Sequence, residues 1–85
     1  MICPVCMERE ATDTHHIFQG ARRKASDKYK EICTIKLCRT CHRLLHDGRL
    51  DAFDLLFKQK AQRKFESLYG HERWMKEFRR NYLND

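Results

Sequence analysis

The sequence is poor in residues that break secondary structure: it has one Pro and three Gly among 85 residues. This scarcity argues against flexible linkers and low-complexity segments, and no internal repeat is visible. No apolar run approaches the roughly 18 residues that a membrane span requires. The opening Met-Ile-Cys-Pro also lacks the basic region and apolar run of a secretory signal. We therefore expect a cytoplasmic protein without membrane contact.

The cysteine pattern indicates how so short a chain is stabilised. A chain of 85 residues forms one domain with a thin core, and such domains usually need disulfides or a metal. Four of the five cysteines form two C-x2-C pairs, Cys3/Cys6 and Cys38/Cys41. In a reducing cytosol these pairs predict a tetrahedral structural Zn²⁺ site. The alternative, redox-active C-x2-C motifs, usually occurs singly and in a βαβ context that this sequence lacks.

The stretch between the two cysteine pairs carries the other notable residues. It is longer than the roughly 15–20 residues of compact zinc modules. It contains the doublet His15-His16 and a basic segment, residues 20–30, that we predict to be a loop. The fifth cysteine, Cys33, lies in an apolar segment and is interpreted as a small buried hydrophobe.

The hydrophobic pattern predicts two strands followed by three helices. Residues 11–18 and 32–37 are rich in β-forming residues and predict a hairpin. Residues 40–47 predict a short helix that Gly48 terminates.

The rest of the chain is predicted to be helical. Asp51 is expected to cap a helix that extends to Leu68. Its apolar residues recur at helical spacing: Phe53, Leu56, Phe57, Ala61, Phe65 and Leu68. Gly70 separates it from a last helix, residues 71–82, in which Trp74, Phe78 and Tyr82 share one face. His71, at its start, is interpreted as a cap or surface residue.

Four histidines have spacings that suit a second metal site. His42 and His46 are four residues apart, so they share one face of the predicted helix and can chelate one ion. A third ligand is expected from the doublet His15-His16. Neighbouring side chains on a strand point to opposite faces, so one histidine can bind the metal while the other faces a different target. This arrangement separates a metal ligand from a general base.

The charge suggests a polyanionic partner. The formal net charge is +6, which is typical of, but not specific to, proteins that bind nucleic acid. Hydrolysis of a phosphodiester needs a divalent ion to stabilise developing charge, and a base such as a neutral imidazole to take a proton from water. The two sets of ligands together suggest such chemistry.

Taken together, the motifs Cys3-x2-Cys6, Thr14-His15-His16-Ile17-Phe18 and Leu37-Cys38-x2-Cys41-His42-x3-His46 resemble those of the HNH (ββα-metal, His-Me finger) nucleases. The likeness covers about residues 3–48 and is to the zinc-stapled subgroup common in phage and bacterial proteins. It implies that His16 is the general base and that His15, His42 and His46 hold a catalytic Mg²⁺, Mn²⁺ or other divalent ion. Colicin-type DNases have the same strand doublet and H-x3-H helix.

The sequence departs from this family at one position. The middle Asn that gives the family its N would fall at or near Cys33, and a thiol cannot make the hydrogen bonds of an amide. In the basic segment, Arg22, Arg23 and Lys24 follow the histidine doublet and are candidate phosphate contacts, although a solvated charge run would look the same.

These observations predict an α+β fold: a small zinc-stabilised ββα-metal, treble-clef-like core with two additional C-terminal helices. Residues 1–48 would form the core and 49–85 a helical extension of one domain. The predicted function is a metal-dependent HNH endonuclease or nickase. Its partner would be DNA, contacted through the backbone with low sequence specificity. A phage packaging or recombination complex in the bacterial cytoplasm is one expected source of specificity.

Two alternatives stay open at this point. One is a non-catalytic zinc module that binds nucleic acid or protein, in which the histidines are vestigial or join the zinc shell. The other is a structural phage protein, which would not depend on the histidine doublet.

Overall fold

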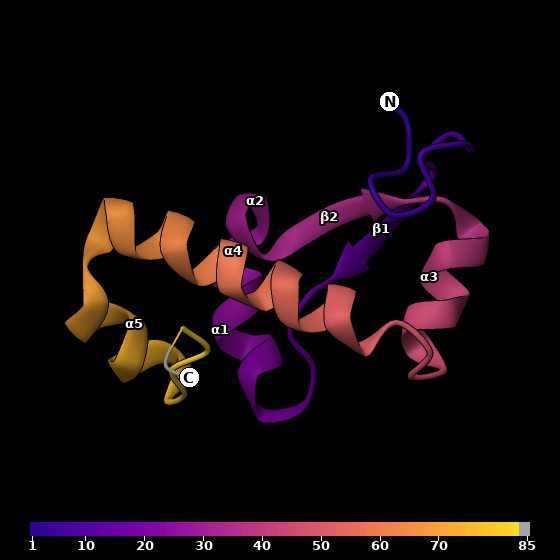
Figure 1. Ribbon diagram of the computed structural model, residues 1–85. Helices are drawn as coiled ribbons and strands as arrows, with labels where there is room; N and C mark the ends of the chain where they lie inside the picture. Colours follow the sequence, from indigo (N-terminus) through magenta and orange to yellow (C-terminus); the bar gives the residue numbers. More distant parts are fainter. Residues whose placement is uncertain (84–85) are drawn as a thin grey trace.

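The structure is a computed structural model that describes residues 1–83, and it is an α+β fold with one two-stranded sheet among these residues. The elements follow in this order: β1 Asp13–His16, a 3-10 turn η1 Gly20–Arg22, α1 Arg23–Lys28, α2 Lys30–Cys33, β2 Thr34–Leu37, α3 Arg39–His46, α4 Asp51–Tyr69 and α5 His71–Phe78. The N-terminal turn and α3 lie at one end of the molecule and α5 at the other, with α4 running between them (Figure 1). No helix within residues 1–83 is both long and apolar enough to cross a membrane.

The two strands pair as predicted, but they are shorter than expected and their connection is helical. β1 and β2 are antiparallel, with His15 opposite Ile35 and Asp13 opposite Leu37. The segment predicted as a basic loop instead forms η1, α1 and α2. It contains good helix formers and no internal Gly or Pro, and it buries Ala25 and Ser26. An ion pair between Arg23 and Asp27, four residues apart at 3.0 Å, further supports α1.

The C-terminal helices also correct several details. Leu50 precedes α4 without a side-chain cap, so Asp51 is the first helical residue and not its cap. Leu56 and Leu68 are exposed because the buried face of α4 is formed by other residues, Phe57, Ala61, Gln62 and Phe65. α5 ends at Phe78 because Arg79 adopts a left-handed conformation with φ of 59°. Tyr82 therefore lies outside the helix, although it is buried as expected.

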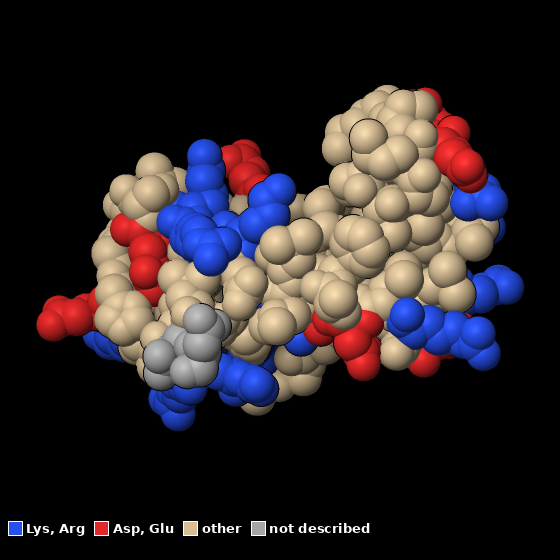
Figure 2. Space-filling model, in the orientation of Figure 1, with Lys and Arg blue, Asp and Glu red and all other residues tan. Residues whose placement is uncertain are grey.

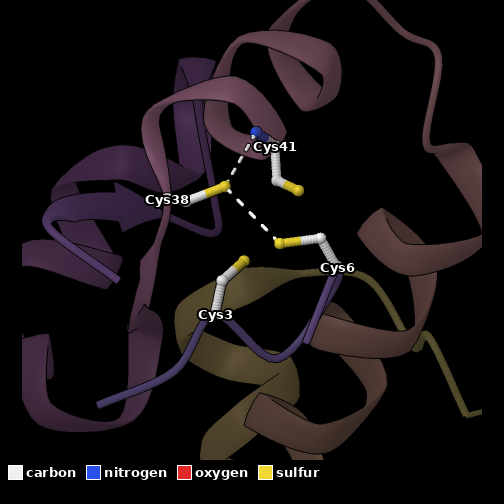
Figure 3. Close-up of side chains that lie close together, drawn as sticks. All are labelled: Cys3, Cys6, Cys38 and Cys41. Carbon is white, nitrogen blue, oxygen red and sulfur yellow. Dashed lines mark hydrogen bonds between the residues drawn. The ribbon is translucent and has the colours of Figure 1, made fainter. Parts of the chain in front are cut away.

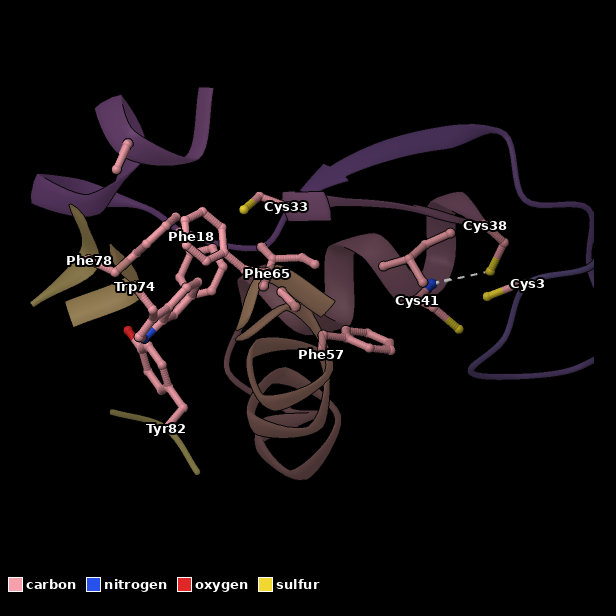
Figure 4. Close-up of a cluster of buried hydrophobic side chains, with 14 residues drawn as sticks. Cys3, Phe18, Cys33, Cys38, Cys41, Phe57, Phe65, Trp74, Phe78 and Tyr82 are labelled. Atoms are coloured by element: carbon pink, nitrogen blue, oxygen red, sulfur yellow. Dashed lines mark hydrogen bonds between the residues drawn. The ribbon is translucent and has the colours of Figure 1, made fainter. Parts of the chain in front are cut away.

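The core has two different ends. At one end, Phe18 packs against Trp74, Phe78 and Tyr82 with ring centroids 5.1–5.7 Å apart. At the other end lie Cys3, Cys38 and Cys41 of the paired cysteines (Figure 4). Phe18 lies just after β1, whereas its aromatic partners lie near the C-terminus. The C-terminal segment therefore completes the core that supports the histidine strand.

Candidate metal centres and the adjoining cleft

The four paired cysteines converge at the junction of the N-terminal turn and α3. Backbone hydrogen bonds from Cys3 N to Arg9 O (2.8 Å) and from Met7 N to Cys3 O (3.0 Å) close the turn that presents Cys3 and Cys6. Cys38 caps α3, its sulfur accepting the Cys41 N–H at 3.4 Å. The four sulfurs point toward one another (Figure 3) and lie within 4.8 Å of one another.

The spacing and electrostatics of the sulfurs fit a zinc ion. Four thiolates about 2.3 Å from a tetrahedral Zn²⁺ lie about 3.8 Å apart, and the sulfurs of Cys6 and Cys38 are separated by 3.8 Å. Backbone N–H groups of Arg9 and Glu8 lower the pKa of Cys6 to about 6. Burial, together with the neighbouring sulfurs, raises the pKa of Cys41 to about 12. A divalent cation would offset the repulsion between neighbouring thiolates, since it favours the thiolate form of every ligand.

A second group of ligands lies next to the first. His15 of β1 and His42 and His46 of α3 bring ring nitrogens within 4.8 Å of one another. The Nε2 atoms of His42 and His46 are 3.1 Å apart, close to the separation of about 3.3 Å expected for two imidazoles on one tetrahedral ion. Cys41 immediately precedes His42, so the cysteine cluster fixes the position from which these helix ligands project.

His15 supplies the strongest indication that this group could hold an ion. It is 5% exposed, and neither of its ring nitrogens has a hydrogen-bond partner within residues 1–83. Burial, and then the neighbouring His42 and His46, lower its pKa to about 4. The ring is therefore neutral at physiological pH and retains a nitrogen lone pair. A buried polar group without a partner is costly, and a bound ion would satisfy it.

Asp13 is a candidate site residue that the sequence patterns did not single out. Its carboxylate oxygen Oδ2 lies 3.2 Å from His42 Nδ1. An ionised carboxylate only accepts, so Nδ1 donates and the Nε2 lone pair is left for a metal. This bond chiefly, with help from Arg39, holds the pKa of Asp13 below its usual value. The available signal was strand alternation, which places Asp13 on the same face as His15.

Replacing Asp13 tests this orienting role. The Asp13→Ala variant should bind a divalent ion at the histidine group about 10- to 100-fold more weakly, because His42 loses the acceptor that fixes its tautomer. Isothermal titration of the zinc-loaded protein with Co²⁺ or Ni²⁺ measures the effect. Thr14→Ala is the matched control, since Thr14 is exposed on the opposite face of the same strand. Equal affinity in both variants would contradict the assignment.

The other predicted site residues lie outside the two clusters. His16 is partly buried and occupies the opposite strand face from His15, and its buried Nδ1 has no partner within residues 1–83. Arg23 pairs with Asp27, whereas Lys24 borders a different cavity between α1 and α5. His71 is exposed and bonds to Glu66 at 2.7 Å, as expected of a surface residue.

Cys33 is fully buried, which confirms its interpretation as a core residue, but it ends α2 and is not part of a strand. Burial raises the pKa of its thiol to about 11, so it is poorly suited to metal binding or to nucleophilic chemistry. Its backbone carbonyl accepts the Ile17 N–H at 3.0 Å and so joins the connection to the histidine strand.

A cavity of about 280 Å³ adjoins the histidine group. His15 and His46 form part of its wall, together with three cationic residues from different elements, Arg22, Lys58 and Arg80. One carboxylate, that of Asp54, also borders it and bonds to Lys58 Nζ at 2.8 Å. The possible metal site therefore opens onto a pocket with more positive than negative charge.

The fold and the two clusters define a small α+β protein with one group of four cysteines and one of three histidines that could bind metal. Comparisons with protein-family models, with curated proteins and with solved structures find no match to this chain.

Proposed function

We propose that this protein is a metal-dependent endonuclease or nickase of the HNH type that hydrolyses DNA phosphodiester bonds. The observation that carries the proposal is the convergence of three imidazoles beside a cavity lined by cations, one imidazole being buried with no partner for either nitrogen within residues 1–83. The cysteine cluster has the closed donor set of a structural zinc site. The histidine cluster instead offers three ligands, which is the number that leaves a position open for water or substrate.

The donor set also bears on the metal. Imidazole nitrogens suit borderline transition ions, whereas Mg²⁺ prefers oxygen ligands and near-octahedral geometry. We therefore propose that Ni²⁺, Co²⁺, Mn²⁺ or Zn²⁺ supports activity better than Mg²⁺. Such an ion would stabilise charge on the phosphoryl and leaving oxygens. His15, His42 and His46 would hold it, and Asp13 would orient His42.

His16 is proposed as the general base. It directly follows the ligand His15 at the end of β1, and an imidazole can accept a proton from water at physiological pH. The Gln19 side chain donates to the His16 carbonyl at 2.9 Å and helps to fix the backbone there. The resemblance to HNH enzymes further implies products with 5′-phosphate and 3′-hydroxyl ends.

The proposed partner is the DNA backbone. Arg22, Arg23 and Lys24 lie just after the histidine strand, and no element within residues 1–83 has the features of a base-reading recognition helix. Intrinsic sequence specificity would thus be low, and a phage packaging or recombination complex would be one source of targeting. The bacterial cytoplasm is the corresponding location.

A non-catalytic zinc module is the second candidate. The close approach of His42 and His46 favours it, because a direct hydrogen bond between one protonated and one unprotonated nitrogen at 3.1 Å needs no ion. This candidate expects one zinc per chain and no second divalent ion.

A supercoiled-plasmid assay tests the nuclease proposal. His16→Ala should reduce cleavage about 10²- to 10⁴-fold, as expected for loss of a general base, while binding metal as wild type does. His71→Ala is the matched control and should cleave normally, because that histidine is exposed and bonds to Glu66 at the surface. Equal cleavage by His16→Ala and wild type would refute the role of His16. No cleavage by wild type with any of Mg²⁺, Mn²⁺, Co²⁺, Ni²⁺ or Zn²⁺ would favour the zinc module.

A further inference from the structure

The segment that follows α5, residues 79–83, is held against α4 by two glutamine side chains, one of them fully buried, that the metal chemistry does not use. Gln62 is 0% exposed, and its Nε2 donates to Asn81 Oδ1 at 2.7 Å while its Oε1 accepts the Tyr82 N–H at 2.7 Å. Gln59 Nε2 donates to the Tyr82 carbonyl at 3.0 Å. A fully satisfied buried network of this kind fixes one conformation of the segment.

This network places two side chains of the segment at the cavity beside the histidines. Arg80 and Tyr82 both line it, and the Trp74 Nε1–H donates to the Arg80 carbonyl at 2.8 Å. The guanidinium of Arg80 lies 5.1 Å from the Tyr82 ring centre, and Lys58 Nζ lies 5.8 Å from it. The Tyr82 ring thus makes an attractive contact with each of these two cations.

The third cation of the cavity, Arg22, is positioned by the C-terminal end of α5. Arg22 Nε donates to the Phe78 carbonyl at 3.1 Å. Neither Arg22 nor Arg80 forms an ion pair within residues 1–83, whereas Lys58 pairs with Asp54. On the face visible in Figure 2, Lys and Arg side chains occur in several separate groups, so net charge alone does not single out a surface. The cavity differs because its cations lie beside candidate metal ligands.

We propose that Arg22, Lys58 and Arg80 form a phosphate-binding site that holds the nucleic-acid backbone next to the histidine cluster. The hydrogen bonds that fix residues 79–83 keep Arg80 in this site. The inference rests on the proposed nuclease function and names the substrate group that this cavity takes. Three cations and one carboxylate line this cavity of about 280 Å³, so its charge suits a backbone phosphate. The site therefore positions the backbone and reads no sequence.

The test measures binding separately from cleavage. The zinc-loaded full chain, without another divalent ion, is titrated into a fluorescently labelled DNA duplex at several salt concentrations. The cleft variant is Lys58→Gln/Arg80→Gln. Its matched control is Lys60→Gln/Arg63→Gln, which removes two exposed cations from outside this cavity, so both variants lose two charges from the net charge of +6. A duplex RNA of the same sequence, titrated in the same way, shows whether the site prefers a DNA or an RNA backbone.

The cleft variant should bind about tenfold more weakly than the control, and its plot of log K against log salt should be shallower by about 1.8, as expected for two lost phosphate contacts. Circular dichroism of both variants guards against misfolding. Equal affinity and equal salt slope in the two variants would overturn the phosphate site, even if the wild type cleaves DNA. Weaker binding by the cleft variant, with no cleavage by the wild type, would support the phosphate site and overturn the nuclease proposal.

Discussion

Removal of zinc by a strong chelator is expected to abolish the cooperative thermal unfolding transition of the whole chain. Structural zinc sites contribute about 10–16 kcal/mol of folding free energy, which is comparable to or larger than the stability of a small domain. The N-terminal turn is otherwise joined to the rest of the protein by few contacts, since its bonds run mainly within residues 1–11. The rings of Phe18, Trp74 and Phe78 lie away from the paired cysteines (Figure 4). Cys41→Ser should have the same effect.

Two optical signals and one control variant make this expectation specific. Circular dichroism reports the helices, and Trp74 fluorescence reports the aromatic end, where Trp74 is 0% exposed and stacks on Phe78 at 3.9 Å. Cys33→Ala is the matched control: it removes a buried thiol outside the zinc cluster and should cost only about 1 kcal/mol. A metal-free protein that keeps its Trp74 emission and a cooperative transition would show that the aromatic core folds without zinc.

Loss of the second metal is the other large effect expected. His42→Ala should bind one divalent ion per chain where the wild type binds two, and plasmid cleavage should fall below detection. The physical reason is that His42 is a central member of the group: its Nε2 faces His46, and its Nδ1 is anchored by Asp13. Two remaining imidazoles on one side of an ion form a weak site.

Metal content measured by mass spectrometry, with the cobalt absorption spectrum of the substituted protein, checks this result. His71→Ala serves as the control because it removes an exposed histidine far from both clusters in sequence. The fold should be retained, since His42 is partly exposed and the cysteine cluster is intact. If His42→Ala still binds two ions per chain, the histidine group is not the second site.

The sequence predicted the members of the two clusters because the spacing within each pair of neighbouring ligands is local. Cys3 and Cys6 share a tight turn, His42 and His46 share a helix face, and strand alternation separates His15 from His16. Sequence reasoning was less successful where segments choose between similar local conformations. The basic composition of residues 20–30 predicts a loop, yet much of this segment is helical and buries Ala25 and Ser26. Leu56 and Leu68 matched a helical period but are exposed, since periodicity does not show which of two apolar stripes has a partner.

The sequence by itself therefore determined which residues can bind metal and which elements carry them, because turn, helix and strand periods place neighbours along the chain. Only the tertiary structure decided what surrounds these ligands. The bond from Asp13 to His42, the contact of Phe18 with the last helix, and the return of Arg80 to the cavity beside His15 all join residues distant in sequence. Such contacts depend on how amphipathic elements pack into one core, and no local spacing encodes that packing.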